Sequence, residues 1–192
     1  CRRYILISSS WVSQFQSGGR VFDSNQQQYI NGKLDIENFL SDCSNKSTNF
    51  TIVRFPIILG VGDVSGRLDY LASRLYQKRP IILPNGGVNK TKFCYADDAA
   101  LLLSAISDSP EKNGFEVLDC LPEESISILS LVKIMGDILS VVPRIINISL
   151  DEILKVAPEF LDVDPFYQET RYTTQSINIF KKFGIKPRFY NE

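Results

Sequence analysis

The chain has 192 residues, 44% of them hydrophobic, which is enough to bury a sizeable core as one domain or as a domain with a small lobe. Its 21 basic and 22 acidic residues leave no charged surface strong enough to favour binding to nucleic acid or to an anionic membrane. The longest apolar block, residues 99–106, is far shorter than the ~20 residues that a membrane-spanning helix requires.

Segments with strand character and segments with helical periodicity alternate along the chain. Residues 4–8 (YILIS) and 50–55 (FTIVRF) are continuous β-rich apolar runs, typical of strands buried on both faces of a parallel sheet. Shorter strands are predicted at 80–84, at the start of 92–106 and at 115–120. Helices are predicted at about 27–42, at 68–76, over the rest of 92–106, at 128–139 and just before Gly184. The alternation predicts an α/β fold with a mostly parallel sheet.

Polar residues at the segment ends predict how the helices begin. Ser127 is predicted to cap the helix at 128–139, and Asp97 or Asp98 to lie near the N-cap of the helix before it. Residues 13–28, rich in glycine and glutamine, are predicted to form a polar loop.

The four cysteines, Cys1, Cys43, Cys94 and Cys120, show no CxxC spacing, and the chain has no histidine. Zinc sites therefore lose their commonest nitrogen ligand, and a chain of this size needs no disulfide scaffold. We expect reduced thiols in a cytoplasmic protein without a metal.

Tyr29 and Lys33 are four residues apart on a predicted helix, so their side chains lie on the same face, one turn apart. A tyrosine can act as a general acid or base near neutral pH only if its phenol becomes more acidic than in water, where the pKa is ~10. An ammonium ~4 Å from a phenolate supplies about 4 kcal/mol at an effective dielectric of ~20. Ser10 follows the first strand, at the edge where open α/β sheets bind ligands. Each feature alone is ordinary structure; the order strand, serine, loop, Tyr-x-x-x-Lys helix, strand favours an active site.

Six segments in the same order resemble the extended short-chain dehydrogenase/reductase family, which includes NAD-dependent epimerases and dehydratases. YILISSSWVS (4–13) is similar to the strand with the family's catalytic serine, and YINGK (29–33) is similar to its Tyr-x-x-x-Lys motif. IVRFPIILGVGD (52–63) resembles its R-P-x-x-x-Y-G-P-G-D segment, and FCYADDAALLL (93–103) resembles its F-I-H-V-D-D-x-A segment. FEVLDCLPEESISILSLVKIM (115–135) resembles its strand with an I-S-x-x-E-L helix, and FKKFGIKPRF (180–189) resembles its near-terminal L-G-W-x-P.

The resemblance implies the C-terminal portion of a Rossmann-type parallel sheet plus a smaller α/β substrate lobe. Residues 1–60 and 90–120 would complete the NAD(P)-binding domain, and residues 61–89 and 121–192 would form the substrate lobe. It further implies a homodimer through the helix that carries Tyr-x-x-x-Lys. The apolar residues available on that helix for both the sheet and the partner are Ile30, Leu34, Ile36, Phe39 and Leu40.

The implied activity is that of an NAD(P)-dependent oxidoreductase, epimerase or dehydratase acting on a hydroxyl or carbonyl of a sugar nucleotide or similar small molecule. Tyr29 would move the proton of the substrate oxygen, Lys33 would make the phenol more acidic and hold the nicotinamide ribose, and Ser10 would orient the substrate oxygen. The residues implied to contact NAD or NADP, with NAD preferred, are Ser8, Tyr29, Lys33, Pro56 and Ile57.

The family's glycine-rich phosphate loop is not among these residues, because the chain opens on Cys1 at roughly the family's fifth strand. GVGDVSG (60–66) follows a strand and precedes a helix, but its third glycine comes one residue late and no ribose-binding acid follows the next strand. We interpret it as an exit from the sheet into the lobe. We therefore expect that an N-terminal segment of the same domain completes the site, and that this chain alone binds NAD(P) weakly.

Departures from the family pattern leave the substrate open. Ile57 stands where many nucleotide-sugar enzymes have asparagine, and Thr91, between Lys90 and Lys92, stands where they have a phosphate-binding arginine. A lysine can neutralise a phosphate, but without the bidentate fork of arginine. Further candidates, each with an ordinary structural role as the alternative, are Arg67, Arg74, Arg79, Tyr70 and Trp11. The alternative functions are a catalytically silent family member used as a binding or regulatory module and an incomplete fragment.

Overall fold

The computed structural model describes residues 2–18, 24–44, 48–110, 114–157 and 178–188. The chain divides into two compact units. The first consists of 1–60, 92–123 and 171–188, and the second of 61–91, 124–170 and 189–192. Each unit is described below by itself.

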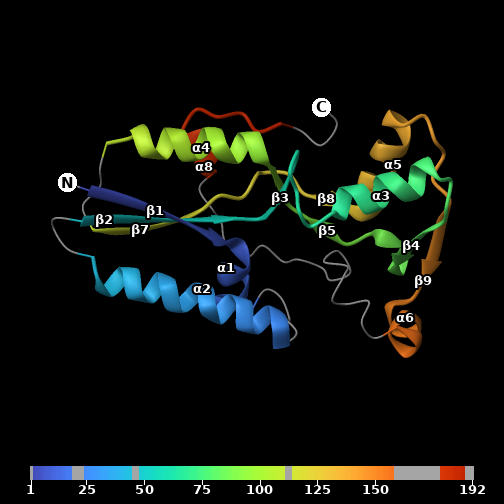
Figure 1. Cartoon of the computed structure of the whole chain (residues 1–192), viewed down its shortest axis with the longest axis horizontal. Helices are drawn as coiled ribbons and strands as arrows, with labels where there is room; N and C mark the ends of the chain where they lie inside the picture. Colours follow the sequence, from blue (N-terminus) through green and yellow to red (C-terminus); the bar gives the residue numbers. More distant parts are fainter. Residues whose placement is uncertain (1, 19–23, 45–47, 111–113, 158–177, 189–192) are drawn as a thin grey trace. The chain divides into compact units, whose positions relative to one another are not determined.

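A three-stranded parallel sheet forms the centre of the first unit (Figure 1). Its order is β1 (Arg2–Ser9), β2 (Thr48–Phe55) and β7 (Phe115–Asp119). The strands pair in a register that aligns Ser8 with Arg54 and Arg54 with Asp119. Because all three run in the same direction, their carboxyl ends meet at one edge of the sheet. The predicted parallel α/β architecture is confirmed.

Helices cover both faces of this sheet (Figure 1). Helix α2 (Ser24–Asp42) lies on one face, and α4 (Ala96–Asp108) and α8 (Ile179–Lys182) lie on the other. Successive side chains of β2 alternate between these two layers, as the pleat of a strand requires. Phe55 therefore packs with α4 and α8, whereas its neighbour Arg54 faces α2.

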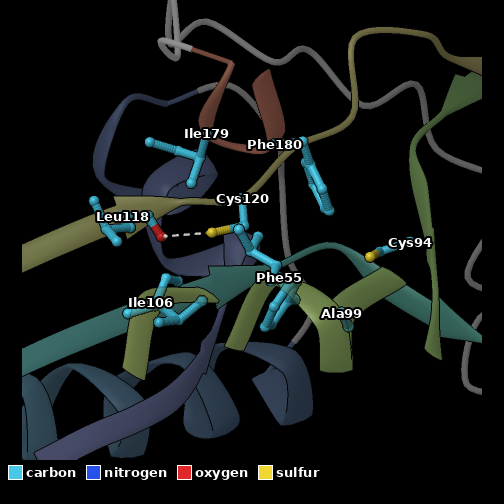
Figure 2. Packing of buried hydrophobic residues seen from close by; sticks show 10 residues of the cluster. Phe55, Cys94, Ala99, Ile106, Leu118, Cys120, Ile179 and Phe180 are labelled. Atoms are coloured by element: carbon cyan, nitrogen blue, oxygen red, sulfur yellow. Dashed lines mark hydrogen bonds between the residues drawn. The ribbon is translucent and has the colours of Figure 1, made fainter. Parts of the chain in front are cut away.

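The main hydrophobic core of the first unit lies between the sheet and the α4/α8 layer (Figure 2). Burying a large apolar side chain stabilises a fold by roughly 1.5–3 kcal/mol. The buried members of this cluster are Val53, Phe55, Cys94, Ala99, Leu102, Ile106, Leu118, Cys120, Ile179 and Phe180. Two of them belong to α8, so residues 178–188 pack with the first unit. The prediction that all of 121–192 forms the substrate lobe was wrong for this segment, because the apolar face of α8 is buried against the sheet layer.

A second parallel pair, β3 (Ile57–Leu59) with β6 (Phe93–Tyr95), continues from β2 and leads into α4. Gly60 ends β3 with a φ of +149°, and a Cβ there would lie 3.0 Å from the Cβ of Ala96. The close approach of the chain to α4 thus favours glycine at this position. The boundary between the two units follows directly after Gly60.

The near-terminal segment is tied to the start of α4 by Arg188. Its backbone N–H donates to the Asp98 carboxylate at 2.8 Å, and its guanidinium pairs with Asp97 at 2.9 Å and lies 4.9 Å from the centroid of the Tyr95 ring. Tyr95 is the N-cap residue of α4 and provides no side-chain cap. Asp97 and Asp98 lie in the first helical turn, where carboxylates interact favourably with the helix dipole.

The second unit contains short strand pairs and three α-helices among its described residues. Strand β4 (Ile81–Pro84) pairs in parallel with β9 (Ile145–Ile148), and β5 (Lys90–Thr91) pairs antiparallel with β8 (Ile126–Ser127). The remaining elements are α3 (Arg67–Tyr76), the 3₁₀ turn η1 (Asn85–Gly87), α5 (Ile128–Ile138) and α6 (Leu150–Val156). Ser127 caps α5 by accepting from the N–H of Ser130, as predicted.

One local prediction was wrong. Residues 13–28 were predicted to form a polar loop, but Ser10–Gln16 form helix α1, and α2 begins at Ser24. The side chain of Ser9 caps α1 by accepting from the N–H of Trp11. A serine hydroxyl competes for backbone donors in the way that favours an N-cap, so the three serines end the strand and start a helix.

The described cysteines are free thiols, and two of them lie in the core. Burial, with a smaller contribution from the Asp98 carboxylate, raises the pKa of the Cys94 thiol to about 12. Burial, with smaller contributions from Cys94 and Asp119, also raises the pKa of the Cys120 thiol. The Cys120 thiol donates to the carbonyl of Leu118 at 3.7 Å (Figure 2). Cys1 lies outside the described residues.

We expect iodoacetamide to modify Cys43, which is exposed, and to leave Cys94 and Cys120 unmodified in the folded chain at pH 8, because only an accessible thiolate reacts. Between pH 8 and 10 the two buried thiols should stay unmodified, because burial raises the pKa of both. Peptide mapping by mass spectrometry separates the sites, and denaturation in urea is the positive control. Equal labelling of Cys94 and Cys43 without urea would contradict the core described above.

None of the helices in the described ranges is long and apolar enough to cross a membrane. Within those same ranges, no group of three or more His, Cys, Asp or Glu side chains could hold a metal ion.

Candidate active site

Helix α2 presents Tyr29, Lys33 and Glu37 at intervals of one turn along the side that faces the sheet edge. The Lys33 Nζ atom lies 5.6 Å from the centroid of the Tyr29 ring, so the ammonium stands close to the aromatic face. Tyr29 is 47% exposed, which leaves its ring open to a ligand. The predicted Tyr–Lys pair therefore lies together at an accessible surface.

Trp11 of α1 packs against Tyr29 edge-on, with ring centroids 6.0 Å apart and an interplanar angle of 85°. Beneath this contact Val12 and Ile30 form a small buried cluster in which α1 and α2 meet, with Trp11 and Leu34 packed against it. The aromatic contact holds one side of the Tyr29 ring. Trp11, predicted as a pocket residue or a packing residue, thus packs against the Tyr29 ring in the structure.

Lys33 is tied to the first strand of the sheet. Its Nζ atom donates to the carbonyl oxygen of Ile7 at 3.4 Å. This is a long hydrogen bond at an exposed site, and such contacts contribute little on their own.

Ser10 is the first residue of α1 and is 1% exposed. Its hydroxyl oxygen accepts from the side-chain amide of Gln14 at 3.5 Å, one turn further along the helix. The side-chain oxygen of Gln14 is buried without a hydrogen-bond partner among the described residues. Ser10 therefore lies one residue from Trp11, which contacts the Tyr29 ring, but a substrate oxygen can reach its hydroxyl only after the atoms that cover it have moved.

A buried polar network links α2 to the carboxyl ends of all three strands. Glu37 on α2 receives the hydroxyl of Ser8 at 2.5 Å and forms a bidentate ion pair with Arg54, whose Nε atom is 3.1 Å from Glu37 Oε1. Arg54 also donates to the hydroxyl of Ser13 at 2.9 Å, and Ser13 donates to the carboxylate of Asp119. Glu37 and Arg54 are 3% and 7% exposed. The network satisfies the charges that it removes from water.

Sequence reasoning did not find this network. Two signals were present: a glutamate one turn beyond Lys33, and an arginine inside the otherwise apolar strand FTIVRF. An ionisable residue in a strand buried on both faces needs a partner of opposite charge.

The other predicted site residues lie near the same sheet edge. Ser8 points to α2 and uses its hydroxyl on Glu37. Pro56 is buried and follows β2 directly, and Ile57 is half-buried and begins β3. Pro56 and Ile57 thus lie at the carboxyl end of β2.

Two of the candidate phosphate-binding residues have structural contacts. In the first unit, Lys92 donates to the carbonyl oxygens of Pro122 and Glu123 at 2.6 and 2.9 Å. Burial lowers the pKa of the Lys92 ammonium, and the Glu123 carboxylate opposes that shift. In the second unit, Arg74 donates to the carbonyl of Pro80 at 2.6 Å and lies over the Tyr70 ring.

The sequence matches the profile of the NAD dependent epimerase/dehydratase family over residues 2–118. No curated protein matches it. Among solved structures, "MoeE5 in complex with UDP-glucuronic acid and NAD" superposes with a TM-score of 0.70 at 16% identity, over 98% of this chain and 60% of that one. The UDP-glucose 4-epimerase of Thermus thermophilus, in complex with NAD, gives 0.65 at 12% identity, over 99% and 61%. The dTDP-glucose 4,6-dehydratase DesIV of Streptomyces venezuelae, with NAD and TYD bound, gives 0.65 at 13% identity, over 97% and 55%. The chain thus spans between 55% and 61% of the length of these structures.

Proposed function

The chain belongs to the NAD dependent epimerase/dehydratase family, and on that premise we propose that it supplies the acid–base part of an NAD(P)-dependent enzyme. The proposed substrate is a sugar nucleotide, of which one hydroxyl or carbonyl group reacts. The observation that carries the proposal is the accessible Tyr29 ring with the Lys33 ammonium 5.6 Å from its centroid. The three structural neighbours named above contain NAD, and their names point to nucleotide sugars.

In this proposal Tyr29 gives a proton to, or takes one from, the substrate oxygen. The Lys33 ammonium, next to the Tyr29 ring, stabilises negative charge that develops on the phenol oxygen during proton transfer. Ser10 orients the same substrate oxygen with its hydroxyl once the atoms that cover it have moved aside. NAD or NADP, when bound, supplies hydride transfer at its nicotinamide ring.

The donors of this chain fit the ribose of such a cofactor. The Lys33 ammonium carries three N–H donors and uses one of them on Ile7, so it can also donate to ribose hydroxyls. Ser8, Pro56 and Ile57 would line the nicotinamide side, because they lie at the carboxyl edge of the sheet, where open α/β sheets bind ligands. NAD is the first cofactor to test, and the free thiols fit a reducing compartment such as the cytoplasm.

We expect the 192-residue chain by itself to bind NAD(H) and NADP(H) more weakly than micromolar. A glycine-rich strand–loop–helix unit normally binds the dinucleotide phosphates, and the sequence of this chain carries no such unit. Isothermal titration calorimetry measures the affinity, with MoeE5 as the positive control. Micromolar binding would show that no second protein segment is needed to complete the site. If the protein as its gene encodes it binds NAD(P) but converts no sugar nucleotide, the function to propose is that of a binding module and not that of an enzyme.

We propose that the enzyme is a homodimer through α2. Ile36 and Phe39 are 46% and 64% exposed on this helix, whereas Ile30 is buried against α1. Replacing both exposed residues with aspartate (Ile36→Asp, Phe39→Asp) should convert a dimer to a monomer, because two charges cannot be buried in an apolar interface. Sedimentation velocity measures the change. Leu101→Asp on α4 is the matched control, since Leu101 is similarly exposed on the opposite face of the sheet. A dimer that survives the double substitution places the interface elsewhere.

A further inference from the structure

The Glu37 carboxylate is fixed at one turn from Lys33 by donors from two strands. Ser8 of β1 donates to Oε1 at 2.5 Å, and Arg54 of β2 donates to both carboxylate oxygens. Arg54 is held on its other side by Ser13, which in turn donates to Asp119 on β7. Helix α2 is therefore connected at one point to every strand of the sheet.

The hydrogen bonds between Arg54 and Glu37 depend on the orientation of the two groups as well as on their distance. A bidentate arginine–carboxylate pair keeps both bonds only when the two groups stay coplanar and in register, and its burial excludes the water that could replace either bond. The tether of Lys33 itself, to the carbonyl of Ile7, is long and lies at an exposed site. Glu37 is thus held to the sheet by buried and shorter hydrogen bonds than Lys33, which lies one turn away on the same helix.

The contacts of α2 with β1 connect the position of Glu37 to that of Lys33. Ile7 and Ser8 are adjacent, and they contact Lys33 and Glu37, which lie on adjacent turns of α2. A shift of α2 that broke the contact at Ser8 would also move the Lys33 ammonium away from Ile7. Tyr29 and Lys33 belong to the same helix and would move together, but the flexible Lys33 side chain, once released from Ile7, would no longer be held beside the Tyr29 ring.

We propose that Glu37 and Arg54 are positioning residues that hold Lys33 against Tyr29. For its catalytic meaning this inference rests on the proposed function. In this proposal the ion pair contacts neither substrate nor cofactor. Its effect is on the position of the Lys33 side chain.

Nuclear magnetic resonance of the full chain, with ¹³C in the ε position of lysine, measures the position of the Lys33 side chain relative to the Tyr29 ring. A lysine ε-methylene over an aromatic ring is shielded by the ring current. Loss of a signal in Lys33→Arg identifies Lys33, and Tyr29→Leu gives its position without the ring. Lys182, whose Nζ atom lies 5.4 Å from the Phe183 centroid, is the internal control that no variant should move.

We expect the Lys33 signal to be shielded in the wild type and to move to the Tyr29→Leu position in Glu37→Gln. Asp35→Asn removes the same charge from an exposed position two residues away on α2 and should leave the signal unchanged. A residue with a purely stabilising role would lower the melting temperature and leave the Lys33 signal where it is.

The outcomes separate the two proposals. If the Lys33 signal is not shielded in the wild type, the ammonium does not lie at the Tyr29 ring in solution, and the proposed function is overturned. Shielding that persists in Glu37→Gln, or that is lost equally in Asp35→Asn, would overturn the positioning role and leave the proposed function intact.

If Glu37→Gln does not fold, the double variant Glu37→Leu, Arg54→Met replaces it. That variant leaves neither charge of the ion pair unpaired, and such replacements are often tolerated. Without the ion pair we expect its Lys33 signal to lie at the Tyr29→Leu position, and a retained wild-type shift would overturn the inference.

Discussion

Replacing Tyr29 with phenylalanine should lower turnover by about 10²–10⁴-fold, the typical contribution of a general acid or base. The substitution removes only the phenol oxygen, so the ring should still pack against Trp11 and the Lys33 ammonium should keep its aromatic neighbour. Cofactor affinity should change little, because the proposed ribose contacts come from Lys33 and the substitution leaves the Tyr29 ring in place for its own contact with the cofactor.

Turnover is measured on the protein as its gene encodes it. UDP-glucose and dTDP-glucose are the first substrates, with NAD added and products separated by liquid chromatography. Tyr76→Phe is the matched control, since Tyr76 lies exposed on α3 of the second unit and should be dispensable. Unchanged turnover in Tyr29→Phe would exclude Tyr29 as the proton-transfer group.

Replacing Arg54 with methionine should lower the free energy of unfolding by about 3–5 kcal/mol, the usual loss when one partner of a buried ion pair is removed. Glu37 would then remain as a buried carboxylate, with the Ser8 hydroxyl as its remaining donor from the network. Total stabilities are about 5–15 kcal/mol, so this loss is a large share of the whole. Methionine keeps most of the volume of the arginine stem, which limits the loss from packing.

Urea unfolding followed by circular dichroism at pH 7 measures this loss. Lys182→Met is the control, because the side chains of Lys182 and its partner Glu116 are 40% and 26% exposed. A pair this exposed should contribute no more than about 1 kcal/mol. The double variant Glu37→Leu, Arg54→Met should lose less than Arg54→Met alone, since it leaves no uncompensated charge of the pair. Equal free energies of unfolding for Arg54→Met and for the double variant would contradict the assignment of this loss to an uncompensated buried charge.

The elements that sequence reasoning predicted well are those with strong local signals. The buried strands at 4–8 and 50–55 correspond to β1 and β2, and the amphipathic stripe at 68–76 corresponds to α3. Ser127 was predicted as a cap because a serine directly before an apolar helical period favours that role. Helix α1 was missed, since serines and glutamines interrupt its seven residues and leave no clear apolar period.

The sequence alone determined the alternation of the main strands and helices, the Tyr–Lys spacing on one helix face, and the family. Local periodicity suffices for the first two, because each depends on residues only a few positions apart, and the order of six motifs along the chain suffices for the family. Only the tertiary structure decided that Ser10 is buried, that Trp11 covers one side of Tyr29, and that Glu37 pairs with Arg54 and Ser8. Those partners of Glu37 lie 17 and 29 positions away in the chain. They meet because the register of the parallel strands and the packing of α2 on the sheet bring them together, and no local pattern encodes either of these.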